Sequence, residues 1–231
     1  MLGWSKQEID WYRAAEAESD YFDRLAQLIA RELPLGAALH DLGCGIGSLA
    51  VRLARRGFAV TAVDTNPQAV AQAGERARQE KLWVETLVAD YTTLSPPVQY
   101  PVLCLCGDIA ADLGLFERWG SKRAVVVTLD ADTLPFKLHP SRRGARSSRE
   151  TEDLLRQAGV GYRTQKLSAM FGQPLDSYQQ VVLFARHHNP EGSQAEIARW
   201  LEDSLTNVQG RYYLPNVKAV TLFYIDCEDA R

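Results

Sequence analysis

The stretch LHDLGCGIGSLA, residues 39–50, decides the fold of this chain of 231 residues. It predicts an apolar strand that ends in an acid and a glycine-rich turn, followed by a helix over 46–56. In a doubly wound sheet such a turn lies at the carboxyl edge of the strand, where a ligand can approach the backbone. Gly43, Gly45 and Gly47 lack the side chains that would block both the bend and the ligand. We therefore expect a ligand site at this turn.

The composition limits the function. The net charge is −3 and 46% of the residues are hydrophobic, so the chain can bury a full core and lacks the positive charge of non-specific nucleic-acid binders. Without a long apolar run or leader-like start, we expect a soluble, cytoplasmic protein with no membrane or nucleic-acid partner. Cys104 and Cys106 could hold a soft metal, but no second Cys or His pair supports them, so no metal and no disulfide is expected.

Strands and helices alternate after the opening strand, which is predicted at 37–41. Further strands are predicted at 58–64, 82–90, 101–106 and 123–129, and helices at 66–80, 109–120 and 149–158. Three consecutive strand tips carry an acid, namely Asp41, Asp64 and Asp90. This repetition is typical of a parallel βαβαβ unit whose polar groups gather at the carboxyl edge.

The last third of the chain departs from this alternation. Residues 162–170 and 178–187 both have strand character and a short connection, which predicts an antiparallel hairpin. A helix at 193–205 and a strand at 217–225 follow. The expected fold class is α/β: a Rossmann-like, seven-stranded mixed sheet of five parallel strands and a C-terminal antiparallel hairpin. Helices cover both faces, with an N-terminal helical cover and a C-terminal α/β addition.

Three segments follow from this division: the cover at 1–35, a ligand-binding domain at 36–188 and the addition at 189–231, which could shape the pocket or make an oligomer contact. The cover holds an aromatic cluster of Trp4, Trp11, Tyr12, Tyr21 and Phe22. These rings could cover a ligand mouth or pack on the sheet edge, and the sequence leaves both interpretations open.

The acids and the glycine spacing narrow the ligand. A carboxylate at a strand tip can accept hydrogen bonds from vicinal ribose hydroxyls, so Asp64 suits an adenosine-like ligand. The dinucleotide pattern G-x-G-x-x-G is not met, because Ser48 stands at its last glycine position. Asp41 places a negative charge where a pyrophosphate would lie, which favours a ligand with a cationic amino group.

At this point the chain resembles the class I S-adenosylmethionine-dependent methyltransferases, whose first motif is E/D-x-G-x-G-x-G. The matching residues run from Asp41 to Gly47, and Asp64 and Asp90-Tyr91 follow in the family's order. The resemblance covers roughly residues 37–188. It implies S-adenosylmethionine as cofactor and S-adenosylhomocysteine (SAH) as product.

The resemblance also implies roles for single residues. The glycine turn would face the methionine part of the cofactor, with Asp41 near its amino group, Asp64 on the ribose hydroxyls and Asp90 on the adenine amino group. The expected cofactor-binding residues are Asp41, Gly43, Cys44, Gly45, Gly47, Asp64, Thr65, Asn66, Asp90 and Tyr91. For each acid, a helix cap or surface turn is the alternative.

The acceptor side is less defined. After the fourth strand, Cys106-Gly107-Asp108 lacks the N/D-P-P-Y/F tetrapeptide of the amino-methylating members of the family, which disfavours an adenine or glutamine amide as acceptor. Asp108 could orient an acceptor or act as a base, or it could cap the next helix. His139 and the arginines of the loop at 142–149 could bind an anionic acceptor or lie in a solvated loop.

The sequence thus predicts a methyltransferase that acts on a small-molecule acceptor by direct in-line transfer. Two alternatives stay open: a non-catalytic S-adenosylmethionine-binding or assembly protein, and a nicotinamide-dependent oxidoreductase. An exposed C-terminal strand could pair across a two-fold axis in a homodimer.

Overall fold

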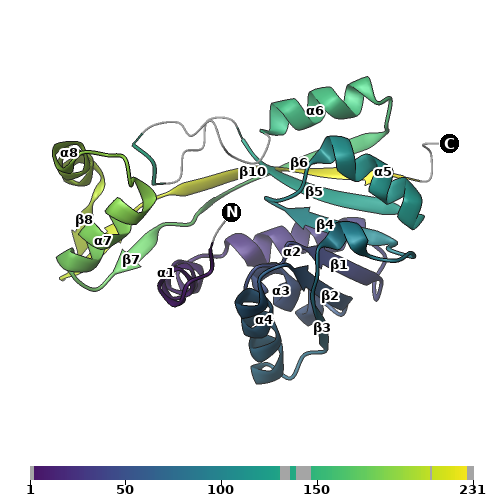
Figure 1. Ribbon diagram of the computed structural model, residues 1–231, viewed down its shortest axis with the longest axis horizontal. Helices are drawn as coiled ribbons and strands as arrows, with labels where there is room; N and C mark the ends of the chain where they lie inside the picture. Colours follow the sequence, from purple (N-terminus) through teal and green to yellow (C-terminus); the bar gives the residue numbers. More distant parts are fainter. Residues whose placement is uncertain (1–2, 131–135, 139–146, 209, 228–231) are drawn as a thin grey trace.

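The computed structural model describes residues 3–130, 136–138, 147–208 and 210–227, and its strands form two sheets (Figure 1). The strands are β1 (Ala38–Leu42), β2 (Ala59–Asp64), β3 (Val84–Val88), β4 (Tyr100–Cys104), β5 (Arg123–Leu129), β6 (Tyr162–Met170), β7 (Gln173–Leu175), β8 (Thr206–Val208), β9 (Arg211–Leu214) and β10 (Val217–Asp226). The helices are α1 (Lys6–Ala17), α2 (Tyr21–Glu32), α3 (Ser48–Arg55), α4 (Pro67–Gln79), η1 (Tyr91–Thr93), α5 (Ile109–Trp119), α6 (Ser148–Gln157), α7 (Tyr178–His188) and α8 (Gln194–Ser204). The main sheet has the order β3-β2-β1-β4-β5-β10-β6, which confirms the predicted seven-stranded mixed sheet.

Helices cover both faces of this sheet (Figure 1). On one face Leu25 and Ile29 of α2 and Leu53 of α3 pack against inward side chains of β1, β4 and β5. The three- and four-residue spacing of such apolar positions is what makes these segments amphipathic helices. On the other face α5 and α6 bury Phe116, Trp119 and Leu155. The carboxyl ends of β1 to β4 stay uncovered by these layers and carry the site described below.

The predicted strand at 178–187 is wrong, because this segment is helix α7. Val181, Phe184 and Ala185 are buried at helical spacing, and the Ser177 side chain caps the helix by accepting from the Gln180 amide. A run of apolar and β-branched residues this short is ambiguous between strand and helix, and tertiary packing decides. With α8 and the small sheet β7-β9-β8, α7 forms an insertion between β6 and β10, at one end of the molecule in Figure 1.

The antiparallel strand of the main sheet is β10, which lies in the segment expected as a C-terminal addition. It pairs with β6 from Val217 to Ile225 and with β5 from Val220 to Asp226. Because β10 is bonded on both sides, it offers no free edge for the two-fold contact considered above. None of the helices within the described ranges has both the length and the apolar character needed to cross a membrane.

Candidate functional site

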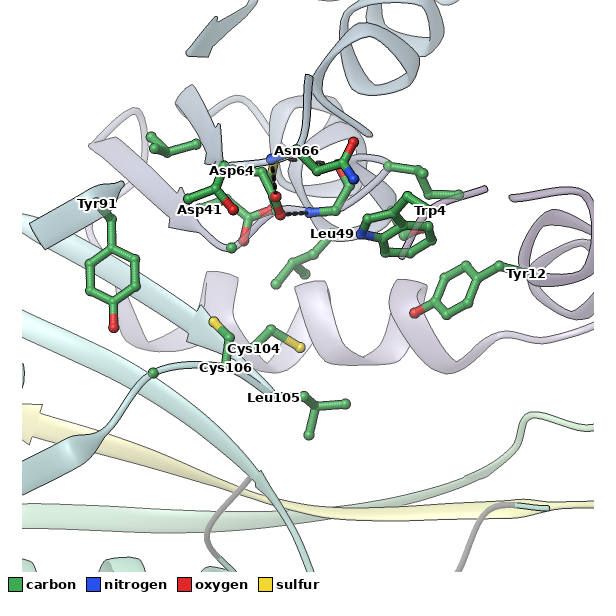
Figure 2. Close-up of a pocket in the computed structure, with 18 of the residues that line it drawn as sticks. Trp4, Tyr12, Asp41, Leu49, Asp64, Asn66, Tyr91, Cys104, Leu105 and Cys106 are labelled. Atoms are coloured by element: carbon green, nitrogen blue, oxygen red, sulfur yellow. Dashed lines mark hydrogen bonds between the residues drawn. The ribbon is translucent and has the colours of Figure 1, made fainter. Parts of the chain in front are cut away.

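A cavity of about 900 Å³ opens at the carboxyl ends of β1 to β4 (Figure 2). Two different walls enclose it. The strand-tip wall consists of pocket residues that follow those strands, in the ranges 41–49, 63–67, 89–91 and 104–107. The cover wall consists of Gly3, Trp4, Tyr12, Phe22 and Lys218, which come from the N-terminal segment, α1, α2 and β10.

The glycine turn begins the strand-tip wall and is held by β2. The amides of Gly43 and Cys44 donate to the Val63 carbonyl at 2.8 and 3.0 Å. Gly47 has a φ of 77°, and a Cβ atom built there would lie 2.7 Å from the Ala73 Cβ. The left-handed backbone and the close helix packing both require glycine at this position. Gly43 and Gly45 of the turn line the cavity, whereas Gly47 packs against α4 and is not among the described residues that line it.

Asp64 is oriented by two backbone amides at the tip of β2. Its Oδ2 accepts from the Gly45 amide and its Oδ1 from the Asn66 amide, each at 2.9 Å (Figure 2). Each carboxylate oxygen keeps acceptor capacity after these bonds. A fixed carboxylate of this kind is suited to accept hydrogen bonds from a pair of ligand hydroxyls.

Asp41 lies beside Asp64 in Figure 2 but is more deeply buried. It is 1% exposed, and its Oδ2 has no hydrogen-bond partner among the described residues. Burial, with a contribution from the charge of Asp64, raises the pKa of Asp41 to about 7, although the Ala50 backbone amide lowers it. A cationic ligand group near this carboxyl would favour its ionised form.

Asp90 and Tyr91 complete this wall at the tip of β3. The exposed Asp90 carboxylate caps η1, accepting from the Thr92 amide at 2.9 Å and the Thr92 hydroxyl at 2.8 Å. These bonds lower the pKa of Asp90. The Tyr91 hydroxyl donates to Asp112 Oδ1 at 3.0 Å, which fixes the ring at the side of the cavity opposite Trp4 and Tyr12 (Figure 2).

Other predicted site residues have different positions. Thr65 lines the cavity and is exposed, while the Asn66 side chain caps α4 and donates to the Gly3 carbonyl at 3.0 Å. Asp108 caps α5 by accepting from the Ala110 amide at 3.2 Å and is not among the described residues that line the cavity. Its catalytic role stays a prediction. His139 and most of the arginine loop lie outside the described residues.

Part of the aromatic cluster of the N-terminal segment covers the cavity, which is one of the two interpretations left open. Trp4 packs edge-on against Tyr12, with ring centroids 5.3 Å apart, and a Cβ atom at Gly45 would lie 2.5 Å from Trp4. Trp4, Tyr12 and Phe22 therefore cover the cavity. Trp11 packs instead against Phe184 of α7 in the insertion, a contact that neither interpretation predicted.

A buried ion cluster fastens α1 to the strand-tip wall. The Glu16 carboxylate accepts from the Ser48 hydroxyl at 2.7 Å, from Arg76 at 3.0 Å and from Arg52. Burial raises the pKa of Glu16, but the hydrogen bond and charge of Arg76 and the charge of Arg52 outweigh burial and lower it. Ser48 directly follows the glycine turn, so the cover and the turn are positioned together.

Sequence reasoning missed Lys218 of the cover wall. The run VKAVTLFYI alternates, and Val220, Leu222 and Tyr224 are buried on one face of β10. Lys218 continues that face toward the cavity. A charged residue in phase with buried ones was the available signal. The described residues contain no group of three or more His, Cys, Asp or Glu side chains that could hold a metal ion.

Comparisons with known proteins agree with this geometry. Residues 40–113 match the family model of a methyltransferase domain. Over 100 residues the chain is 33% identical to a glycine/sarcosine N-methyltransferase of Parasynechococcus marenigrum, covering 42% of this chain and 34% of that protein. The match covers about a third or less of the length of each of these curated relatives.

Solved structures share the fold at low identity. The YcgJ protein of Bacillus subtilis aligns with a TM-score of 0.56 at 16% identity, covering 88% of this chain and 98% of that one. The magnesium protoporphyrin IX methyltransferase of Synechocystis, solved with bound SAH, aligns with a TM-score of 0.54 at 15% identity, covering 98% and 90%.

Proposed function

We propose that the chain is a class I S-adenosylmethionine-dependent methyltransferase and that it transfers the methyl group of S-adenosylmethionine to a small-molecule acceptor. The cofactor would bind along the strand-tip wall. The observation that carries this proposal is the Asp64 carboxylate, held by two amides at the tip of β2 and directed at the cavity beside a glycine turn.

The residues of this wall fit the cofactor part by part. Asp64 keeps acceptor capacity for both ribose hydroxyls. Asp41, buried and with one oxygen unpartnered among the described residues, supplies the negative environment that an amino group needs. Gly43 lines the cavity beside these acids, and it lets the tips of β1 and β4 approach each other, since a Cβ atom there would lie 2.7 Å from Cys106 Sγ.

The chain's own contribution to the reaction is alignment and exclusion of water. When bound, S-adenosylmethionine supplies a methyl group activated by its sulfonium. Trp4, Tyr12 and Phe22 face the strand-tip wall with largely apolar surface, which keeps the cavity dry and limits how an acceptor approaches. In-line transfer then depends on how these side chains orient the acceptor.

A small-molecule acceptor is supported by the names of the relatives. One is named for glycine and sarcosine and another for magnesium protoporphyrin IX. The absence of the N/D-P-P-Y/F tetrapeptide after β4 agrees with this, because Cys106, Gly107 and Asp108 stand there.

Calorimetric titration of the full chain with SAH tests the proposal. We expect measurable binding, weakened roughly a hundredfold (about 3 kcal/mol) by Asp64→Ala, because two charge-assisted hydrogen bonds are lost. Asp10→Asn, on the exposed side of α1, is the matched control and should leave affinity unchanged. The proposal fails if the wild-type chain does not bind SAH, or if Asp64→Ala behaves like the control.

The alternatives give different results in the same setting. A nicotinamide-dependent oxidoreductase would bind NADH and not SAH. A non-catalytic binding protein would bind SAH but transfer no labelled methyl group from S-adenosylmethionine to any component of a metabolite extract.

A further inference from the structure

We propose that Lys218 is the anion-binding residue of the cavity and that it takes a carboxylate. That carboxylate belongs either to the methionine part of the cofactor or to the acceptor. The inference rests on the proposed function for the identity of these ligands, and it assigns a role to a residue of the cover wall.

The position of Lys218 follows from strand alternation. Side chains at 220, 222 and 224 of β10 are buried in the core beneath α2 and α3. Lys218 is in phase with them, near the start of the strand, where the core gives way to the cavity. Its side chain is therefore directed into the protein and reaches the ligand space.

Three aromatic rings hold the ammonium group in place. Lys218 Nζ lies 4.6 Å from the ring centroid of Tyr21, 4.8 Å from that of Phe171 and 5.6 Å from that of Phe22. Such contacts stabilise a cation through the ring faces. They leave the N–H groups without a charged acceptor.

Among the described residues Lys218 has no ion pair and no hydrogen bond to its ammonium. The titratable groups nearest to it are the Cys104 thiol of β4, Tyr21 of α2 and, on the same cover wall, Tyr12 of α1. Burial lowers the pKa of Lys218 to about 8, although the charge of Cys104 raises it. A buried cation without a counter-ion is costly, and an incoming carboxylate would relieve that cost.

The cavity is consequently bipolar. Asp41 and Asp64 lie on the strand-tip wall and Lys218 on the cover wall, and the charges of both Lys218 and Asp41 act on Cys104 of the strand-tip wall. An amino-acid group with its ammonium toward the acids and its carboxylate toward the lysine matches this distribution. The cofactor carries such a group, and an amino-acid-type acceptor would carry another.

The two sources can be separated by NMR on the full chain with ¹³C-labelled lysine. The Lys218 signal is identified by its loss in Lys218→Met, and its pKa is followed in the free protein, with SAH and with 5′-methylthioadenosine, which lacks the amino-acid group. If the cofactor is the source, SAH raises the pKa of Lys218 by roughly one unit and 5′-methylthioadenosine does not. If the acceptor is the source, acetate, propionate or benzoate raises it in the SAH complex, and the matching amides do not.

Affinity provides the second measurement. Lys218→Met should weaken binding of the ligand that supplies the carboxylate about tenfold and leave the affinity for 5′-methylthioadenosine unchanged. Lys218→Arg should restore binding because the charge returns. Thermal melting checks that both variants fold. The inference is overturned if SAH binds but neither SAH nor any of the acids changes the pKa of Lys218. Absence of SAH binding would instead overturn the proposed function.

Discussion

The two walls of the cavity are built in opposite ways. The strand-tip wall is made of backbone and of carboxylates fixed by neighbouring amides, as for Asp64 between the amides of Gly45 and Asn66. The cover wall is made of side chains from segments far apart in the chain, such as Trp4 and Lys218. The strand-tip wall is suited to a ligand that related proteins share, and the cover wall is suited to a ligand that differs among them.

The comparison also shows where the walls depend on each other. Glu16 belongs to α1, yet its partners Ser48 and Arg76 hold the glycine turn, the latter through the Ile46 carbonyl at 3.3 Å. We infer that the cover is fastened to the cofactor side by this one cluster more than by contacts across the cavity.

Glu16→Gln should have the largest effect on stability among the changes that test the comparison. Removing the carboxylate charge leaves Arg52 and Arg76 buried without their shared counter-ion, which we expect to cost about 4 kcal/mol of unfolding free energy. Urea denaturation gives this value. The matched control is Glu18→Gln, which breaks an exposed pair with Arg211 and should cost less than about 1 kcal/mol. Equal losses of unfolding free energy in the two variants would contradict a special role for the buried ion cluster.

Gly47→Ala should come next, with a loss of about 3 kcal/mol from left-handed strain and from the clash with Ala73. Two other glycines separate these causes. Gly120 has a φ of 64° and open space, so Gly120→Ala reports strain alone, about 1 kcal/mol. Gly114 lies in α5 with open space, and Gly114→Ala should be neutral or stabilising. Thermal melts of the three variants would contradict the account if Gly47→Ala matched Gly120→Ala.

Asp41→Asn should give a smaller, pH-dependent effect. Because the pKa of Asp41 is raised in the folded state to about 7, the folded protein retains a proton that the unfolded chain has lost. The wild-type protein therefore loses stability as pH rises from about 4 to about 7, and Asp41→Asn removes that part of the slope. Relative to wild type, the variant should gain roughly 2 kcal/mol between pH 5 and pH 8 in denaturation experiments. Parallel pH profiles would show that Asp41 is ionised in the free protein.

The strand-tip wall was largely predictable because it is local in sequence. The strands at 58–64 and 101–106 and the acids at 41 and 64 follow from periodicity and from turn chemistry within short windows. The seven-stranded sheet and the position of the glycine turn were predicted correctly on that basis. The roles given to Asp90 and Asp108 stay predictions, and the structure adds that both side chains act as caps.

The cover wall was not predictable to the same degree. The segment at 178–187 was assigned to the sheet, and its place in the predicted hairpin is taken by β10, some 40 residues later. Only long-range strand pairing determines that β10, and not this segment, enters the main sheet, and no local sequence pattern predicts that pairing. Lys218 was missed although its alternation with buried residues is visible in the sequence, because that alternation indicates an inward side chain only once β10 is known to pair on both edges.

The most direct test of the division between the walls is a crystal structure of the full chain with SAH. We predict that both ribose hydroxyls lie within hydrogen-bond distance of the Asp64 carboxylate and that the homocysteine part follows the turn from Gly43 to Gly47. A nucleoside bound instead between α1 and β10, with Asp64 contacting only the amides of Gly45 and Asn66, would contradict the account.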